Sequence, residues 1–352
     1  MTLAVRCLFC ALVLVAATPG AAWAQQGPLW QVGPRAVPPP AGASAVLRDS
    51  IAATPQPDVA ARARHPQSTA AWEAAIAARD SARTVPLAEL ARRFDVSIER
   101  DEIAGVRVHR VTPERRSPTH SQHLFLYVHG GAYVYGGGDS GVAEAARIAG
   151  SAGIDALSID YRMPPAHPFP AAVEDVVSVY RAELERHAPG ALAIGGTSAG
   201  GGLALAAVHR FKMLGLPVPG AIYAGTPWAD LSKTGDSLFT NEGIDRVLVT
   251  YDGSLGAAAR LYAAGRDLKD PLLSPVYGDF SGFPPTYLVT GTRDMFLSDT
   301  ARTHRKLRNA GVTAELNVYE GMSHAGYAFE PDAPESQQVY GELAAFLDAH
   351  LR

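Results

Sequence analysis

Apolar positions fall into short continuous runs that alternate with longer stretches of helical periodicity over most of the chain. The runs predict buried strands at residues 124–128, 156–159, 192–194, 222–224, 287–290 and 316–319. Helical patterns follow at residues 142–151, 171–187, 199–213, 299–310 and 335–350. The alternation predicts an α/β fold, with a mostly parallel sheet that helices cover on both faces.

The N-terminal third of the chain departs from this alternation. Residues 25–57 are rich in Pro, Gly and Ala, with Pro38-Pro39-Pro40 at their centre, which predicts an extended linker or mobile arm. Residues 58–96 are rich in Ala and Arg and are predicted to be helical, with Trp72 and Leu90 among their apolar anchors. Two short strands within residues 98–111 are expected to begin the sheet.

The first 24 residues have the pattern of a secretory signal peptide. Arg6 precedes an apolar run from Cys7 to Ala17, and Ala22-Trp23-Ala24 offers a small-residue cleavage site. A run of about a dozen apolar residues is too short to span the ~30 Å hydrocarbon core of a membrane. We therefore predict export to the periplasm or the medium, with cleavage after Ala24 and no stable membrane insertion.

Composition excludes several classes of partner and cofactor. The formal charge of −4 over 352 residues, with arginines interspersed among acidic residues, does not predict nucleic-acid binding. Both cysteines, Cys7 and Cys10, lie in the predicted signal peptide, so thiolate chemistry and disulfides are not expected in the mature protein. The histidines lack zinc-ligand spacing, and we predict neither a metal nor another cofactor.

The pentapeptide Gly196-Thr197-Ser198-Ala199-Gly200 lies where a predicted buried strand meets a helix of small residues. Glycines beside a serine at such a strand-to-helix junction permit a sharp turn that exposes the serine hydroxyl, a geometry known as the nucleophile elbow. A lone G-x-S-x-G pattern in a chain rich in glycine is weak evidence, and an ordinary glycine turn is the alternative. Ser198 is the candidate nucleophile if suitable partners exist elsewhere.

Two such partners follow in the order serine, acid, histidine. Asp294 lies in the loop after the strand predicted at 287–290, and His324 lies in the loop after the strand predicted at 316–319. In open α/β sheets, the catalytic and ligand-binding residues lie at these carboxyl ends of the strands. A serine needs an imidazole to accept its proton, and a carboxylate to orient that imidazole. Ser198, Asp294 and His324 are thus a predicted catalytic triad.

The strand predicted at 124–128 opens into His129-Gly130-Gly131-Ala132-Tyr133, a loop with little side-chain bulk. Backbone N–H groups in this loop, at Gly130, Gly131 and Ala132, are candidate oxyanion-hole donors together with that of Ala199. A phosphate-binding loop is the alternative, but no lysine follows the glycines.

These motifs, together with Asp160-Tyr161-Arg162, His167-Pro168-Phe169-Pro170, Asp270-Pro271-Leu272-Leu273-Ser274-Pro275 and Gly321-Met322-Ser323-His324, carry a family resemblance. From about residue 120 to 350 the chain resembles the bacterial hormone-sensitive lipase family of carboxylesterases, in its branch with a Gly-Thr-Ser-Ala-Gly elbow. The resemblance implies an α/β-hydrolase fold, the same triad and the same oxyanion donors. Ala132 departs from the family's usual third glycine, and a Cβ there disfavours positive φ.

The resemblance also implies a helical cap, which we assign to residues 58–96 and to an insertion at 228–265, with the catalytic core at 97–227 and 266–352. Esters with short or medium acyl chains are the implied substrates. Two other readings remain open: an acyltransferase or amidase that uses the same triad, and a non-catalytic small-molecule binding protein. Oligomeric state is not predicted.

Overall fold

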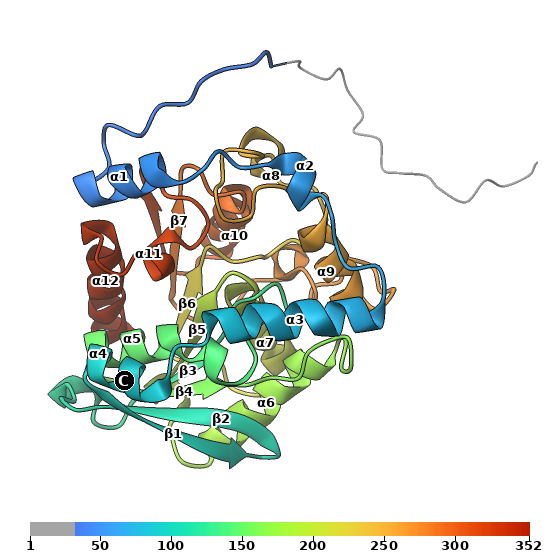
Figure 1. The fold of residues 1–352 in the computed structure, drawn as a ribbon. Helices are drawn as coiled ribbons and strands as arrows, with labels where there is room; N and C mark the ends of the chain where they lie inside the picture. The colour runs from blue at the N-terminus through green and yellow to red at the C-terminus, as the bar shows by residue number, and fades with distance from the viewer. Residues whose placement is uncertain (1–31) are drawn as a thin grey trace, which may run out of the picture. The chain divides into compact units, whose positions relative to one another are not determined.

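An eight-stranded sheet forms the centre of the fold in the computed structural model, with the strand order β1-β2-β4-β3-β5-β6-β7-β8 (Figure 1). The strands are β1 (Val96–Ile103), β2 (Val106–Pro113), β3 (Leu124–Val128), β4 (Asp155–Ile159), β5 (Leu192–Thr197), β6 (Ala221–Gly225), β7 (Thr286–Gly291) and β8 (Ala314–Tyr319). Strand β2 pairs antiparallel with β1 and β4, and all other pairs are parallel. The predicted mostly parallel sheet is confirmed, and its parallel strands end at one common edge.

The structure describes residues 32–352, and residues 38–352 form the unit that contains every helix and strand discussed below. The predicted signal peptide, residues 1–24, lies outside the described residues. In the described part of the chain, no helix combines the length and the apolar character needed to cross a membrane.

Helices cover both faces of the sheet (Figure 1). The α-helices are α1 (Ala45–Ala53), α2 (Val59–Arg62), α3 (Thr69–Arg83), α4 (Leu87–Phe94), α5 (Ala143–Ala152), α6 (Ala171–Leu184), α7 (Ala199–Met213), α8 (Ser237–Thr240), α9 (Ser254–Ala263), α10 (Leu297–Asn309), α11 (Gly326–Phe329) and α12 (Pro334–His350). Short 3₁₀ helices lie at η1 (Pro118–His120), η2 (Gly138–Gly141), η3 (Pro189–Ala191) and η4 (Pro275–Tyr277).

Strand β3 shows how the sheet separates two apolar layers. Its side chains alternate in direction, as the pleat of a strand requires. Leu124, Leu126 and Val128 join a buried cluster with α6 and α7, whereas Phe125 and Tyr127 join a second cluster with α5 and α12. Each layer covers one face of the sheet, which explains why the strands are apolar at successive positions.

The predicted linker at 25–57 is wrong in its C-terminal part, because residues 45–53 form helix α1. Ser44 caps this helix by accepting the N–H of Leu47 at 3.2 Å, and Leu47 is buried. The N–H and hydroxyl of Ser44 also donate to Glu335 of α12, at 2.6 and 2.8 Å. A helix of nine residues is marginal alone, so contacts with a distant part of the chain stabilise it.

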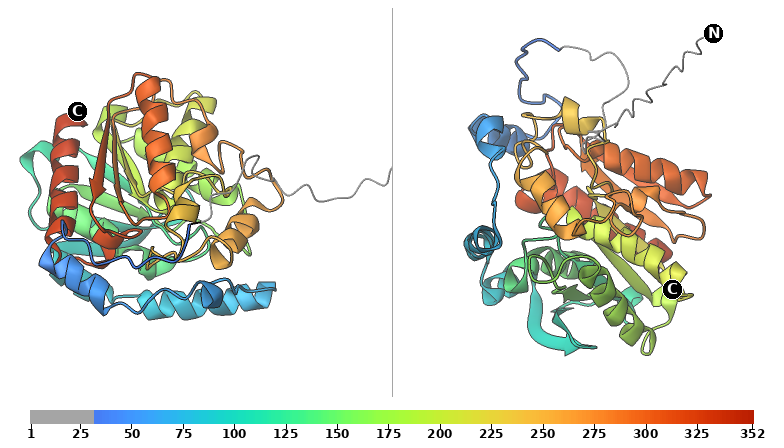
Figure 2. Two further views of the ribbon diagram at one scale, coloured as in Figure 1. Left: turned by 90° about the horizontal axis from the view of Figure 1, so that it is seen from above. Right: turned by 90° about the vertical axis from the view of Figure 1, so that its right-hand side faces the viewer.

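Helices α2, α3 and α4 occupy the segment that was predicted to be helical, and Figure 2 shows α1, α2 and α3 in blue along one side of the other helices. Trp72 of α3 packs in a small buried cluster with Val134 and Tyr135, from the loop after β3, and with Ala257 and Ala258 of α9. The two segments assigned to a cap therefore meet over this loop.

Candidate active site

Ser198 occupies a strained turn between β5 and α7. Its backbone has φ 63° and ψ −125°, which is rare for a residue with a side chain. A Cβ at Gly196 or Gly200 would lie 1.9 or 2.0 Å from the carbonyl oxygen of Val128, so neither position can carry a side chain. The predicted nucleophile elbow is thus present, and its glycines are required by the close approach of β3.

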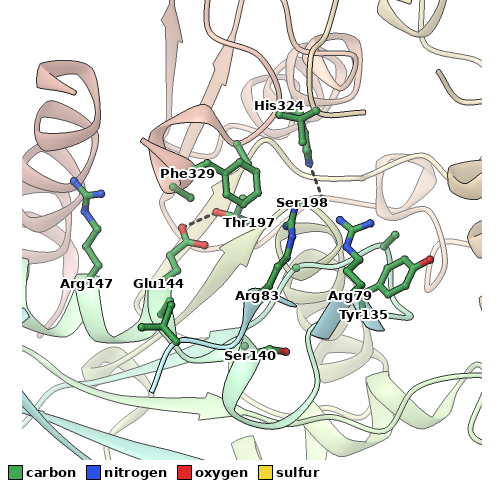
Figure 3. Close-up of a pocket in the computed structure, with 18 of the residues that line it drawn as sticks. Arg79, Arg83, Tyr135, Ser140, Glu144, Arg147, Thr197, Ser198, His324 and Phe329 are labelled. Carbon is green, nitrogen blue, oxygen red and sulfur yellow. Dashed lines mark hydrogen bonds between the residues drawn. The ribbon is translucent and has the colours of Figure 1, made fainter. Parts of the chain in front are cut away.

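The structure brings Ser198, His324 and Asp294 together although 126 and 30 positions separate the successive pairs. Nε2 of His324 lies 2.8 Å from Oγ of Ser198 (Figure 3). Nδ1 of the same ring lies 3.1 Å from Oδ1 of Asp294. Asp294 is fully buried and His324 nearly so. The three groups form the continuous hydrogen-bonded chain that proton transfer from the serine requires.

Two threonines that the sequence did not single out hold the carboxylate of Asp294. Thr226, directly after β6, donates its hydroxyl to Oδ2 of Asp294, and Thr290 of β7 donates to the same oxygen at 2.9 Å. Oγ1 of Thr226 also lies 3.1 Å from Nδ1 of His324. The sequence could have indicated these threonines only through their positions at the ends of β6 and β7, because catalytic and ligand-binding residues of open α/β sheets lie at that edge.

A second buried carboxylate, Asp245, supports the backbone beside Asp294. Its Oδ2 accepts the N–H of Met295 at 2.9 Å, and its Oδ1 accepts the N–H groups of Val247 and Leu248. Burial, and then the charge of Asp294, raise the pKa of Asp245 to about 6. Asp245 thus connects the predicted insertion at 228–265 to the loop that carries the candidate acid, Asp294.

The loop after β3 has the backbone shape of an anion cradle. Gly131 has φ 118°, Ala132 φ 55° and Tyr133 φ 63°, and the carbonyl of Gly131 accepts the N–H groups of Val134 and Tyr135. Ala132 therefore adopts the positive φ that its Cβ disfavours. Within residues 32–352, no hydrogen bond engages the N–H groups of Gly131, Ala132 or Ala199. These donors are free to bind an oxyanion.

Gly130 has a steric role beside the nucleophile, because a Cβ there would lie 2.7 Å from the carbonyl oxygen of Thr197. His129 holds the loop: its Nδ1 lies 2.8 Å from the carbonyl oxygen of Gly130, and its ring stacks on Tyr161 at 4.1 Å. Burial lowers the pKa of His129, which favours the neutral ring. These contacts give His129 a structural role in the loop.

A cavity of about 640 Å³ opens onto Ser198 and His324 (Figure 3). Apolar side chains of the N-terminal helices and of the insertion contribute to its lining, among them Leu90, Phe94, Leu248 and Leu255. The volume is within the range of ~300–1,000 Å³ that is usual for small-molecule sites. The cavity can therefore hold a small substrate next to the serine.

Beside the nucleophile, Glu144 of α5 accepts hydrogen bonds from a ring of hydroxyl groups. Thr197 donates at 2.6 Å, Tyr127 at 2.8 Å, Tyr223 at 2.9 Å and Tyr340 at 3.1 Å. Burial, and then the charge of Glu144, raise the pKa of the three tyrosines, which keeps them protonated as donors. This carboxylate fixes the residue before Ser198, and no motif in the sequence indicated it.

In the part of the chain that the structure describes, no three His, Cys, Asp or Glu side chains are grouped so that they could hold a metal ion.

Comparison with known protein families identifies the family to which this fold belongs. A family model of the alpha/beta hydrolase fold matches residues 125–328, which is more than half of the chain. The chain therefore belongs to the α/β-hydrolase family.

Solved structures and sequence relatives show which group of α/β-hydrolases the chain is similar to. The chain is similar to the crystal structure of an esterase, E25, with 50% identity and a TM-score of 0.90 over 92% of this chain and 99% of that one. It is also similar to an esterase from the bacterial hormone-sensitive lipase family, with 32% identity and a TM-score of 0.70 over 86% and 95% of the two chains. An acetyl-hydrolase of Streptomyces hygroscopicus is 36% identical over 63% of this chain and 74% of its own. The chain is a member of the bacterial hormone-sensitive lipase family, within the carboxylic ester hydrolases.

Proposed function

We propose that this protein is a serine carboxylesterase that hydrolyses esters of short- to medium-chain acids through an acyl-Ser198 intermediate. The observation that supports the proposal best is the hydrogen-bonded chain from Oγ of Ser198 through the imidazole of His324 to Asp294, with distances of 2.8 and 3.1 Å. The similar proteins are esterases and an acetyl-hydrolase, which supports the same reaction.

In the proposed reaction, Oγ of Ser198 attacks the ester carbonyl carbon while its proton passes to Nε2 of His324. The carbonyl oxygen becomes negative and accepts hydrogen bonds from the N–H groups of Gly131, Ala132 and Ala199. His324 then returns the proton to the departing alcohol, which leaves the acyl group on Ser198. In the second half of the reaction, a water molecule gives a proton to His324 and attacks the acyl carbon. His324 returns this proton to Oγ of Ser198 as the acid leaves. Asp294 orients the ring and stabilises its charged form.

Replacement of Ser198 by alanine tests the nucleophile. With p-nitrophenyl butyrate, we expect Ser198→Ala to lower kcat by a factor of about 10³ or more, because the covalent route is lost. The matched control is Ser178→Ala, since the Ser178 hydroxyl donates to a carbonyl within α6 and is not among the cavity-lining residues. Equal turnover by Ser198→Ala and the wild type would remove Ser198 from the mechanism.

The same measurements separate the proposed esterase from its alternatives. A burst of p-nitrophenol equal to the enzyme concentration, with mass spectrometry of the acylated serine, would demonstrate the intermediate. A series of acyl chain lengths defines the preferred ester, and competing amides and alcohol acceptors test for an amidase or acyltransferase. Absence of turnover with every ester and amide would favour a binding protein instead.

Export remains a prediction from the pattern of residues 1–24. A signal sequence that ends at Ala24 would place the esterase in the periplasm or in the medium, with Gln25 as its first residue.

A further inference from the structure

Arginines outnumber acidic side chains in the lining of the cavity at Ser198. Five arginines line it against a single acidic side chain: Arg62, Arg79, Arg83, Arg93 and Arg147, with Glu144. The chain as a whole has a formal charge of −4, so this positive charge is a local feature. Hydrolysis of an ester with hydrocarbon acyl and alcohol parts gives these cations no role.

Two of the five arginines are engaged in structural contacts. Arg147 donates to the carbonyl oxygens of Tyr327 and Pro331, at 3.4 and 3.1 Å, and lies over the ring of Tyr340. Arg93 lies 3.7 Å from the carboxylate of Asp332. These contacts account for both side chains without a ligand.

Arg79 and Arg83 are different. They are four residues apart on α3, so they lie on the same face of that helix, and Figure 3 shows both side chains extending into the cavity. Arg79 lies over the ring of Tyr135 at 4.4 Å, and Arg83 over the ring of Phe329 at 5.2 Å. Among residues 32–352, no carboxylate lies within 4.0 Å of either guanidinium.

Two acidic groups of this region, Glu144 in the cavity lining and Asp80, whose charge acts on Arg79, have other hydrogen-bond partners. Glu144 accepts four hydroxyl groups, and Oδ1 of Asp80 accepts the N–H of Gly136 at 2.9 Å. Arg79 is half-buried, and burial followed by the charge of Arg83 lowers its pKa. Like charges held together away from water are unfavourable unless an anion accompanies them. A solvated helix surface explains the exposed Arg83 and Arg62, but not a half-buried Arg79 that faces the cavity.

We propose that the preferred substrates of this enzyme are esters that carry a carboxylate, which Arg79 and Arg83 bind while the ester carbonyl lies at Ser198. This inference rests on the proposed esterase function. A planar guanidinium matches a carboxylate with two parallel hydrogen bonds, so a pair of arginines on one helix face favours this group over a hydroxyl or an amide. Arg62, which lines the same cavity, adds to the positive field.

Matched pairs of esters test the proposal. In the first arm the charge is on the acyl part: p-nitrophenyl hemisuccinate is compared with p-nitrophenyl 4-methylpentanoate, in which an isopropyl group replaces the carboxylate. In the second arm the charge is on the alcohol part: 4-carboxyphenyl acetate is compared with its carboxamide. The measured quantity is the ratio of kcat/KM for the charged ester to that for the neutral ester.

In at least one arm, we expect replacement of both arginines by glutamine, Arg79→Gln with Arg83→Gln, to lower this ratio at least tenfold. Glutamine keeps the helix propensity of α3, and thermal unfolding checks that the double variant folds. The single variant Arg83→Glu, at the exposed position, should lower the ratio further than Arg83→Gln. High salt should reduce the wild-type ratio, because ions screen partly exposed charges.

Arg92→Gln is the matched control, since Arg92 is an exposed arginine of α4 that does not line the cavity. Its ratio should equal that of the wild type. A ratio that the double variant changes in neither arm would overturn the proposed carboxylate preference. Turnover of the neutral ester by the wild type, and its loss in Ser198→Ala, test the esterase function separately, so the two failures are distinguishable.

Discussion

The carboxylate of Asp294 accepts four hydrogen bonds, of which one comes from the imidazole that it orients. The others come from the hydroxyls of Thr226 and Thr290 and from the N–H of Phe296. Asp294 is fully buried, and a buried charge is tolerated only when such partners replace water. At the scale of single residues, the candidate acid Asp294 is thus held in one orientation by two hydroxyl groups and one backbone N–H.

We expect Thr226→Val to lower kcat about tenfold while KM changes little, because the carboxylate loses a charge-assisted hydrogen bond of about 1.5–3 kcal/mol. Valine is also branched at Cβ, so the strain of the positive φ of 36° is similar in both proteins. Thr226→Ser keeps the hydroxyl and should restore most of kcat. Steady-state kinetics with p-nitrophenyl butyrate provide the test, and equal kcat for Val and Thr would show that Thr226 does not position Asp294.

At the scale of elements, two loops at the ends of β3 and β5 are shaped by close backbone approach. The elbow after β5 needs glycines because the carbonyl oxygen of Val128 lies where a Cβ of Gly196 or of Gly200 would be. The loop after β3 folds back on itself, and a Cβ at Gly131 would lie 2.1 Å from the carbonyl oxygen of Tyr135. These glycines are therefore fixed by sterics as well as by the direction of the N–H groups.

We expect Gly131→Ala to lower kcat by about 10² or more, because its φ of 118° and the clash with Tyr135 force the oxyanion donors to move. Gly138→Ala is the matched control: φ is also positive, at 61°, but nothing lies within 4 Å of the added Cβ. That control should lose only about 1–2 kcal/mol of stability. Kinetics and thermal unfolding of both variants would test the prediction, and similar kcat values would contradict it.

At the scale of the whole molecule, the burial of His209 couples folding to pH. His209 of α7 packs against Phe280 and Phe283, and its Nε2 lies 3.1 Å from the carbonyl oxygen of Pro275. Burial lowers the pKa of His209 to about 4, from an ordinary value of about 6.5. Between these values the unfolded chain binds a proton that the folded protein does not, so folding loses stability as the pH falls.

We expect the burial of His209 to lower the free energy of unfolding by about 3 kcal/mol between about pH 7.5 and pH 4, with little effect at higher pH. His209→Gln cannot take up this proton, so its stability should fall less steeply over the same window, even if it is lower at pH 7. Urea unfolding at several pH values measures the difference. His167→Gln, at an exposed position, is the control, and equal slopes for His209→Gln and the wild type would contradict the prediction.

The sequence could predict those structural features that depend on residues close together in the chain. Strands β3 to β8 follow from apolar runs, and the elbow at Ser198 follows from two glycines at a strand-to-helix junction. Asp294 and His324 were accessible because each follows a strand, and parallel strands place their carboxyl ends at one edge. The order of these residues and the family motifs made the same assignment, and the geometry agrees with it.

By itself, the sequence predicted a mostly parallel α/β sheet from its apolar runs, and the α/β-hydrolase fold and the candidate triad from motifs of a few neighbouring positions. Only the tertiary structure showed that α1 is a packed helix, that Thr226 and Thr290 hold Asp294, and that Arg79 and Arg83 face the catalytic cavity. These features depend on contacts between distant segments, such as the 291 positions that separate Ser44 from Glu335. No local pattern encodes such a contact, because its free energy arises only when the folded chain brings both partners together.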